Sequence, residues 1–319
     1  MKRRHALTLL GAAFVPRASA ASNGGRLNFE CGLMGTRFAI CCYHPDRSAA
    51  EQAAEAAFRE AEAINAVASD YIADSELLRL SNHPAGQPVV VSPQIFRLLW
   101  QARELAEKTR GHFDPTLGPL TRLWRESRRR KSLPDAATLA NAIASCGWRH
   151  LVLDPDKLEV TFEKPGMRLD LGGIAKGQAA DAMLATLASH GITRACITAG
   201  GDVRAGDAPP GTDGWKIGVR SSAPEVRSLL LLNAAVSTSG DFHQFVEIGG
   251  TRYSHIIDPA TGLGSTRAVS ATVIAADSST ADALATACCV APEKEATKLA
   301  LSAGVKRVHI DVASGFRKR

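Results

Sequence analysis

The order of strand-like and helix-like segments constrains the fold of this 319-residue chain more than any other feature. Short apolar runs that are typical of strands alternate irregularly with stretches whose apolar residues recur at helical spacing. This order lacks the regular strand–helix–strand repeat of a doubly wound parallel sheet. The sequence therefore predicts an α+β architecture of mixed sheets with packed helices.

The same patterns place the individual elements. Strands are expected over 38–43, 195–198, 215–219, 229–232, 245–248, 269–275 and 305–312, with a hairpin over 151–160. Helices are expected over 48–68, 92–111, 135–145, 174–190, 279–290 and 293–303. The basic stretch 121–134 is expected to form a loop that ends at Pro134.

Composition defines the kind of core. Hydrophobic residues make up 45% of the chain and charged residues 22%, so a sizeable core is available. Aromatic residues make up only 5%, so the core is expected to be aliphatic and rich in alanine. The net charge of +6 comes partly from the run Arg128–Lys131, which no aromatic residues interrupt, and we therefore expect no nucleic-acid partner.

The N-terminal residues resemble an export signal. A basic segment (2–4) precedes a short apolar segment (6–15) and the small-residue sequence Ala18-Ser19-Ala20. The Arg3-Arg4 pair is also compatible with twin-arginine export, and no cysteine stands at a lipoprotein position. We expect a signal peptide over 1–20 and a periplasmic mature chain over 21–319.

The seven cysteines show no C-x-x-C motif and no zinc-ligand spacing. An odd number leaves at least one free thiol in an oxidising compartment. Most of these cysteines are expected to be small buried hydrophobic residues.

The segment Asp170–Gly177 places two glycines, Gly172 and Gly173, before an expected helix start. Glycine lets a backbone approach a ligand closely, and a helix N-terminus favours phosphate. Lys176 adds a positive charge. Taken alone, this pattern is compatible with a phosphate site or with a tight structural turn.

Asp282 and Thr286 are four residues apart in an expected helix and therefore lie on one face. Their two hard oxygens are of the kind that Mg²⁺ prefers, and the ion completes its octahedron with water and substrate phosphates. The alternative is an exposed aspartate beside a threonine that hydrogen-bonds to its own helix.

The run Tyr253–Gly262 holds His255 between a strand end and an Asp-Pro turn, next to apolar Ile256 and Ile257. A histidine in a rigid frame can move protons near neutral pH. The alternative is a core histidine with a satisfied hydrogen bond.

Several shorter motifs complete an ordered set. The motifs, in chain order, are Met34-Gly35-Thr36, Asp74-Ser75-Glu76-Leu77, the segment 111–120 with Phe113-Asp114-Pro115-Thr116, Asp170–Gly177, Gly200-Gly201-Asp202, Ser239-Gly240-Asp241, Tyr253–Pro259 and Asp282–Thr286. In this order, over residues 28–312, the chain resembles the ApbE family of FAD:protein FMN transferases.

The resemblance implies an ApbE-like fold in a single two-lobed catalytic unit. It also implies an enzyme that binds FAD with Mg²⁺ and moves FMN onto a Thr or Ser hydroxyl of an exported or membrane-linked acceptor protein, releasing AMP. An Mg²⁺-dependent FAD pyrophosphatase that yields FMN and AMP is the first alternative. A flavin-binding protein without turnover is the second.

The resemblance also assigns roles to residues. Asp282, Thr286 and the main-chain oxygen of Gly173 match the metal contacts, and His255 matches the base that activates the acceptor hydroxyl. The positions that match FAD contacts are Met34, Tyr71, His112, Phe113, Asp114, Asp170, Lys176 and Ile256.

The chain departs from the family pattern after Trp124. A segment like Gly-Phe-Gly is replaced by Arg125-Glu126-Ser127 and the basic run. The basic run is typical of a solvated surface, and contact with an acidic protein partner is the alternative. The export signal without a lipid anchor resembles that of accessory family members linked to nitrous oxide respiration.

Overall fold

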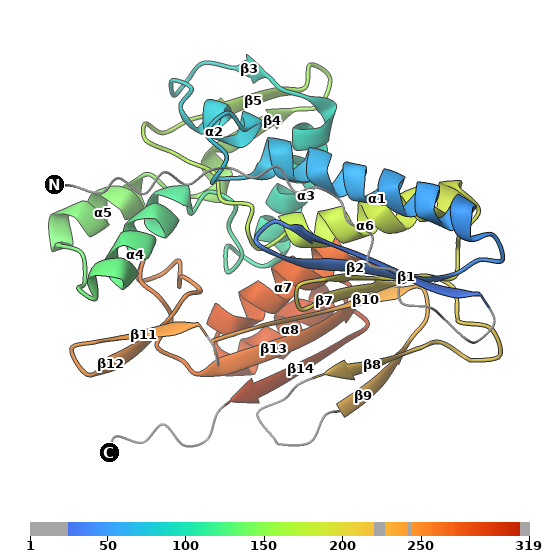
Figure 1. Ribbon diagram of the computed structural model, residues 1–319. Helices are drawn as coiled ribbons and strands as arrows, with labels where there is room; N and C mark the ends of the chain where they lie inside the picture. The colour runs from blue at the N-terminus through green and yellow to red at the C-terminus, as the bar shows by residue number, and fades with distance from the viewer. Residues whose placement is uncertain (1–24, 220–226, 242–243, 313–319) are drawn as a thin grey trace, which may run out of the picture.

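A seven-stranded antiparallel sheet forms the centre of the molecule (Figure 1). The computed structural model describes residues 25–219, 227–241 and 244–312, and the expected signal peptide lies outside them. The sheet has the order β1-β2-β6-β7-β10-β13-β14. Its strands are β1 (Arg26–Leu33), β2 (Thr36–Tyr43), β6 (Ala195–Ala199), β7 (Asp202–Ala205), β10 (Ala234–Gly240), β13 (Val269–Ala275) and β14 (Arg307–Val312).

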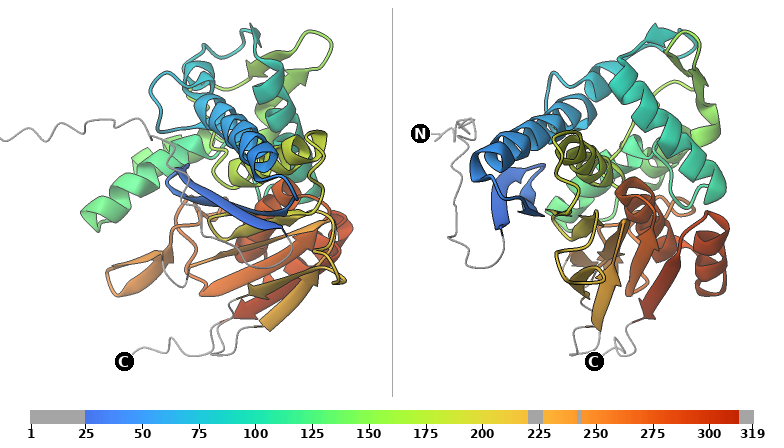
Figure 2. Two further views of the ribbon diagram at one scale, coloured as in Figure 1. Left: turned by 45° about the vertical axis from the view of Figure 1, so that its right-hand side comes forward. Right: turned by 90° about the vertical axis from the view of Figure 1, so that its right-hand side faces the viewer.

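Helices α1 (Arg47–Ala68), α6 (Ala175–Ser189) and α7 (Ser278–Val290) cover one face of this sheet, and α8 (Glu293–Ser302) packs against α7 and β14 (Figure 2). The buried side of α1 is mostly alanine. Small side chains let α1 approach α6 closely, and this confirms the expected alanine-rich core.

The hairpin of β8 (Trp215–Val219) and β9 (Arg227–Leu231) lies against the opposite face of the sheet. Trp215 and Leu231 pack there with Val203 and Val236 of the sheet in a separate hydrophobic cluster.

A smaller lobe carries the sheet β3-β5-β4, made of β3 (Val89–Val90), β5 (Glu159–Phe162) and β4 (Leu151–Asp154). Helices α2 (Glu76–Ser81) and α3 (Pro93–Lys108) and the short 3₁₀ helix η1 (Trp148–His150) complete it. Ser92 caps α3 through its hydroxyl and Pro93 occupies the first turn, as the sequence predicted.

The expectation of a loop over 121–134 is wrong, because residues Gly118–Arg130 form helix α4. Leu120, Trp124 and Ser127 recur at helical spacing on its buried side. Three arginines in its last turn face the negative end of the helix dipole, and Lys131 ends the helix in the left-handed conformation. The charge of this stretch concealed its helical periodicity.

A third hydrophobic cluster ties α4 to α5 (Ala136–Ala144) and to the hairpin of β11 (Phe245–Ile248) and β12 (Thr251–Ser254). Leu120 and Trp124 pack here with Ile257. The indole Nε1 of Trp124 donates to the Ser254 carbonyl at 3.0 Å. These contacts fix the segment that carries His255.

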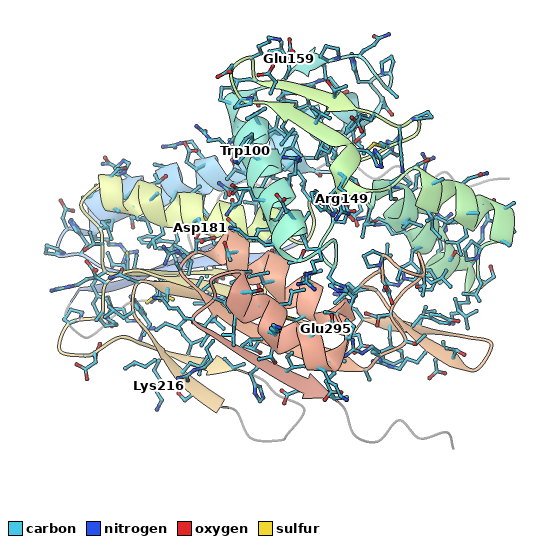
Figure 3. All side chains as sticks on the ribbon, turned by 180° about the vertical axis from the view of Figure 1, so that it is seen from behind. Trp100, Arg149, Glu159, Asp181, Lys216 and Glu295 are labelled. Carbon is cyan, nitrogen blue, oxygen red and sulfur yellow. The ribbon has the colours of Figure 1, made fainter. Side chains whose placement is uncertain are left out.

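Helices α6 and α7 meet at their N-terminal halves. A Cβ at Gly177 of α6 would lie 2.4 Å from the Ser278 carbonyl oxygen, so only glycine allows this approach. Asp181, labelled in Figure 3, accepts hydrogen bonds from the backbone N–H groups of Ser278 and Ser279 at 2.8 and 2.9 Å. One helix therefore caps the other.

None of the helices in the described part of the chain is long and apolar enough to cross a membrane.

We predict that Gly177→Ala destabilises the protein by about 1–3 kcal/mol, because the new methyl group collides with backbone atoms. Chemical denaturation measures this loss. Gly32→Ala is the matched control, since a Cβ at Gly32 meets nothing within 4 Å. Equal stability of the two variants would contradict the close contact of α6 and α7.

Candidate active site

A cavity of about 330 Å³ lies where α4, the α6 and α7 N-terminal halves and the strand end after β12 meet. It brings together residues that are far apart in the sequence. Of the residues predicted from the sequence, the cavity is lined by Tyr71, His112, Phe113, Asp114, Asp170, Gly173, Lys176, His255, Ile256, Asp282 and Thr286.

Met34 is absent from the lining residues. It lies in the two-residue turn between β1 and β2, where both Met34 and Gly35 have positive φ. Its side chain packs against the main hydrophobic core. A contact of Met34 with FAD stays a prediction.

Asp282 and Thr286 form one corner of the cavity, on the same face of α7. Asp282 is only 3% exposed. The Thr286 hydroxyl lies 3.2 Å from the Ser239 hydroxyl. A Cβ at Gly173 would lie 3.3 Å from Thr286 Oγ1, so the glycine backbone approaches this corner closely.

The donor set of this corner suits a hard divalent cation. A carboxylate, a hydroxyl and a backbone carbonyl are oxygen ligands that Mg²⁺ accepts, with water and substrate phosphates as the remainder. No cluster of three or more His, Cys, Asp or Glu side chains suited to a metal occurs among the described residues. A soft-metal or zinc centre is therefore not what this corner resembles.

Lys176 lies between two carboxylates. Its Nζ is 3.1 Å from Asp282 Oδ2 and 3.6 Å from Asp202 Oδ2. Burial alone would lower the pKa of Lys176, but the two carboxylates raise it above its usual value. Burial and the charge of Asp282 raise the pKa of Asp202. Lys176 thus forms ion pairs with Asp282, which lines the cavity, and with Asp202 behind it.

Asp170 shapes the glycine turn before α6. Its carboxylate accepts hydrogen bonds from the Gly172 backbone N–H at 2.8 Å and from the Thr121 hydroxyl at 2.5 Å. These contacts orient the turn that presents Gly173 and connect it to α4.

The turn His112–Asp114 follows α3 and is held by its own hydrogen bonds. Asp114 accepts from the Thr116 hydroxyl at 2.6 Å and from the Trp148 backbone N–H at 3.1 Å. Burial raises the pKa of Asp114 and lowers that of His112. Phe113 is buried and supplies an apolar wall.

Tyr71 also lines the cavity and is 77% exposed. The Arg125 guanidinium lies over its ring at 4.4 Å and forms an ion pair with Asp70. An exposed aromatic ring at the rim of a cavity offers a surface for stacking.

His255 directs one ring nitrogen to the backbone. Its Nδ1 lies 3.2 Å from the Gln244 carbonyl oxygen, which accepts only if Nδ1 carries the proton. That tautomer leaves Nε2 unprotonated and able to take a proton. Burial lowers the pKa of His255, so the imidazole is neutral at pH 7.

The sequence reasoning did not identify the α4 residues that line the cavity. Thr121, Trp124, Arg125 and Arg128 all contribute to its wall. Their spacing of three to four residues is the signal in the sequence that indicates a helix, but the charge of the stretch obscures it.

The chain matches the ApbE family over residues 34–308. It is 34% identical over 246 residues to the FAD:protein FMN transferase of Vibrio cholerae serotype O1, covering 75% of this chain and 73% of that protein. It is 35% identical over 235 residues to the protein of the same name from Treponema pallidum, with 68% of this chain covered. This match spans 65% of the Treponema protein, slightly less than two thirds of its length.

Solved structures of flavin transferases share the fold of this chain. The apo form of Pseudomonas stutzeri flavinyl transferase ApbE superposes with a TM-score of 0.80 at 27% identity, covering 91% of this chain and 92% of that one. The flavin transferase ApbE of Vibrio cholerae gives 0.76 at 29% identity, with 89% and 92% covered. The expected mixed architecture is confirmed, and the chain belongs to the ApbE family.

Proposed function

We propose that this protein transfers FMN from FAD to a Thr or Ser hydroxyl of an acceptor protein, with Mg²⁺ as cofactor and AMP as the leaving product. The observation that carries the proposal is the single cavity that joins a neutral histidine, a lysine and an Asp–Thr–Gly oxygen corner. The curated relatives named above bear the name of this activity.

The reaction exchanges one phosphorus–oxygen bond for another. The acceptor oxygen attacks the phosphorus of the FMN half of FAD, and the bond from that phosphorus to the oxygen of AMP breaks. His255 takes the proton of the attacking hydroxyl on Nε2, while the Gln244 carbonyl holds the opposite ring nitrogen. In-line placement of the two reactants by the cavity walls contributes the larger share of the rate.

The oxygen corner would hold the metal ion. Asp282, Thr286 and the Gly173 carbonyl are its proposed ligands, and the ion would neutralise charge on the pyrophosphate. Lys176 reaches this corner from α6 and holds the Asp282 carboxylate in place at 3.1 Å. Its ammonium group also lies where a phosphate oxygen can be bound.

The remaining predicted residues would enclose the flavin and adenine parts of FAD. Tyr71 offers a ring for stacking, and Phe113 and Ile256 offer apolar surface. The Asp114 and Asp170 carboxylates accept hydrogen bonds from protein groups, so they keep the turns that line the cavity in position.

We also propose that this protein is exported and meets an exported acceptor, because its N-terminal residues resemble an export signal. N-terminal sequencing of the mature protein from the periplasmic fraction tests this. A start near Ala21 is expected, and an intact N-terminus in the cytoplasm would contradict it.

The decisive experiment incubates the protein with FAD, MgCl₂ and exported proteins from its own cells. Fluorescence of covalently bound flavin on a denaturing gel is the expected result. Release of FMN and AMP without a labelled protein would identify an FAD pyrophosphatase instead. FAD binding without either product would identify a flavin-binding protein.

We predict that Asp282→Asn raises the Mg²⁺ concentration for half-maximal turnover by at least about tenfold, because a charged ligand is lost. Titration of MgCl₂ at saturating FAD measures the change. Asp213→Asn is the control, since Asp213 is exposed and does not line the cavity. An unchanged Mg²⁺ dependence of Asp282→Asn would refute the metal assignment.

We predict that transfer slows only at a pH below the ordinary histidine pKa of about 6.5. The reason is that burial lowers the pKa of His255, so this side chain is protonated, and lost as a base, only at more acidic pH. His255→Gln is expected to lower kcat by about 10²–10⁴-fold at pH 7.5, with FAD affinity retained. His150→Gln is the control, because His150 lies outside the cavity lining.

Two results would count against His255 as the base. One is a rate of transfer that falls at acidic pH in His255→Gln as it does in the unmodified protein, since another group would then be titrating. The other is a parallel loss of kcat and of FAD affinity, which indicates a structural role.

A further inference from the structure

We propose that Arg128 of α4 binds the pyrophosphate of FAD and so selects phosphate-bearing flavins. This inference rests on the proposed function and deepens it, because it adds a specificity-determining residue to the same cavity. It concerns a helix that the sequence did not predict.

The geometry of α4 directs Arg128 to the cavity. Leu117, Thr121, Trp124, Arg125 and Arg128 follow one another at helical spacing, and all five line the cavity. This row of side chains is held in place, because Trp124 is buried and its indole N–H donates a hydrogen bond to the carbonyl of Ser254, the residue before His255. Arg128 lies one turn beyond Trp124, and it is half-buried.

The other arginines at the end of α4 behave differently. Arg129 and Arg130 are exposed and form ion pairs with Glu126 of the same helix. They do not line the cavity. They therefore serve as internal comparisons for Arg128.

The charges around the cavity single out Arg128. Lys176 is balanced by Asp202 and Asp282, and Arg125 is balanced by Asp70. Arg128 has no ion pair and no side-chain hydrogen bond within the described residues. It is thus the lining cation whose charge no carboxylate neutralises in the part of the chain that the structure describes.

A pyrophosphate needs such a charge. The lining carboxylates, Asp114, Asp170 and Asp282, equal the lining cations, Lys176, Arg125 and Arg128, in number. Because Lys176 and Arg125 are already paired with carboxylates, Arg128 is the lining cation among the described residues whose charge is left to attract the two negative charges of a pyrophosphate. A guanidinium matches phosphate oxygens with two parallel N–H donors, which makes Arg128 suited to this contact.

The electrostatic influence of Arg128 shows which part of the cavity it reaches. Burial is the main cause of the lowered pKa of His255, and the positive charge of Arg128 lowers it further. The same charge acts on Tyr71, another lining residue. Arg128 therefore lies near both His255 and Tyr71, in the cavity where we place the pyrophosphate of FAD.

The test compares FAD with riboflavin, which lacks phosphates, by quenching of flavin fluorescence in the full-length protein. Arg128→Ala is expected to weaken FAD binding about tenfold and to leave riboflavin binding unchanged. Arg128→Lys keeps the charge and should recover part of the loss. Arg129→Ala, the matched control, should bind both flavins as the unmodified protein does.

Displacement of bound FAD by inorganic pyrophosphate gives a second measurement. The inhibition constant of pyrophosphate, corrected for the FAD affinity of each variant, should be about tenfold higher in Arg128→Ala than in Arg129→Ala at low salt, and the difference should shrink at high salt. Thermal unfolding of each variant confirms that the comparison is made on folded protein.

Three outcomes would overturn the inference while the proposed function stands. FAD binding could be unchanged in Arg128→Ala, both flavins could weaken equally, or only transfer to the acceptor could suffer. The last result would assign Arg128 to the acceptor. Failure of the unmodified protein to bind FAD would instead overturn the proposed function.

Discussion

The contact between the N-terminal halves of α6 and α7 is the constraint on which the site depends. Gly177 lets the backbones meet, and Asp181 accepts hydrogen bonds from the first N–H groups of α7. This arrangement brings Lys176 of one helix within 3.1 Å of Asp282 of the other. This half-buried carboxylate cap is a strong interaction, because several donors satisfy the charge of Asp181.

A second anchor positions His255. Trp124 binds the Ser254 carbonyl, and Gly264 lies so close to both that a Cβ there would be 2.1 Å from that oxygen. The strand end before His255 is therefore clamped between α4 and the following turn. The two anchors lie in different hydrophobic clusters, and the hydrogen bond from Thr121 of α4 to Asp170 connects them.

Much of the architecture could be predicted from periodicity. Helices with clear caps and apolar faces, such as α3 and α6, lie close to their expected bounds. Strand β10 was missed because Ala, Ser and Thr dominate it, and its burial comes from the neighbouring strands. Helix α4 was missed because its mean character is charged, although one narrow stripe is apolar. Tertiary context, which a local pattern does not contain, decided both cases.

The site was predictable to a different degree. Short ordered motifs identified His255, Asp282, Thr286 and Lys176, and the structure brings these four together. The partnership of Lys176 with Asp202 was not predictable, because Asp202 follows a glycine turn that also serves an ordinary hairpin. Pairings between distant segments depend on strand order rather than on sequence spacing.

The wide separation of the cavity-lining residues along the chain has a consequence for when the cavity forms during folding. The walls draw on Tyr71 near the start and Thr286 near the end, and α7 lies against strands β10 and β13 in the middle of the sheet. A nascent or unfolded chain therefore has no partial version of the site. The cavity is therefore complete only once the last third of the chain has folded.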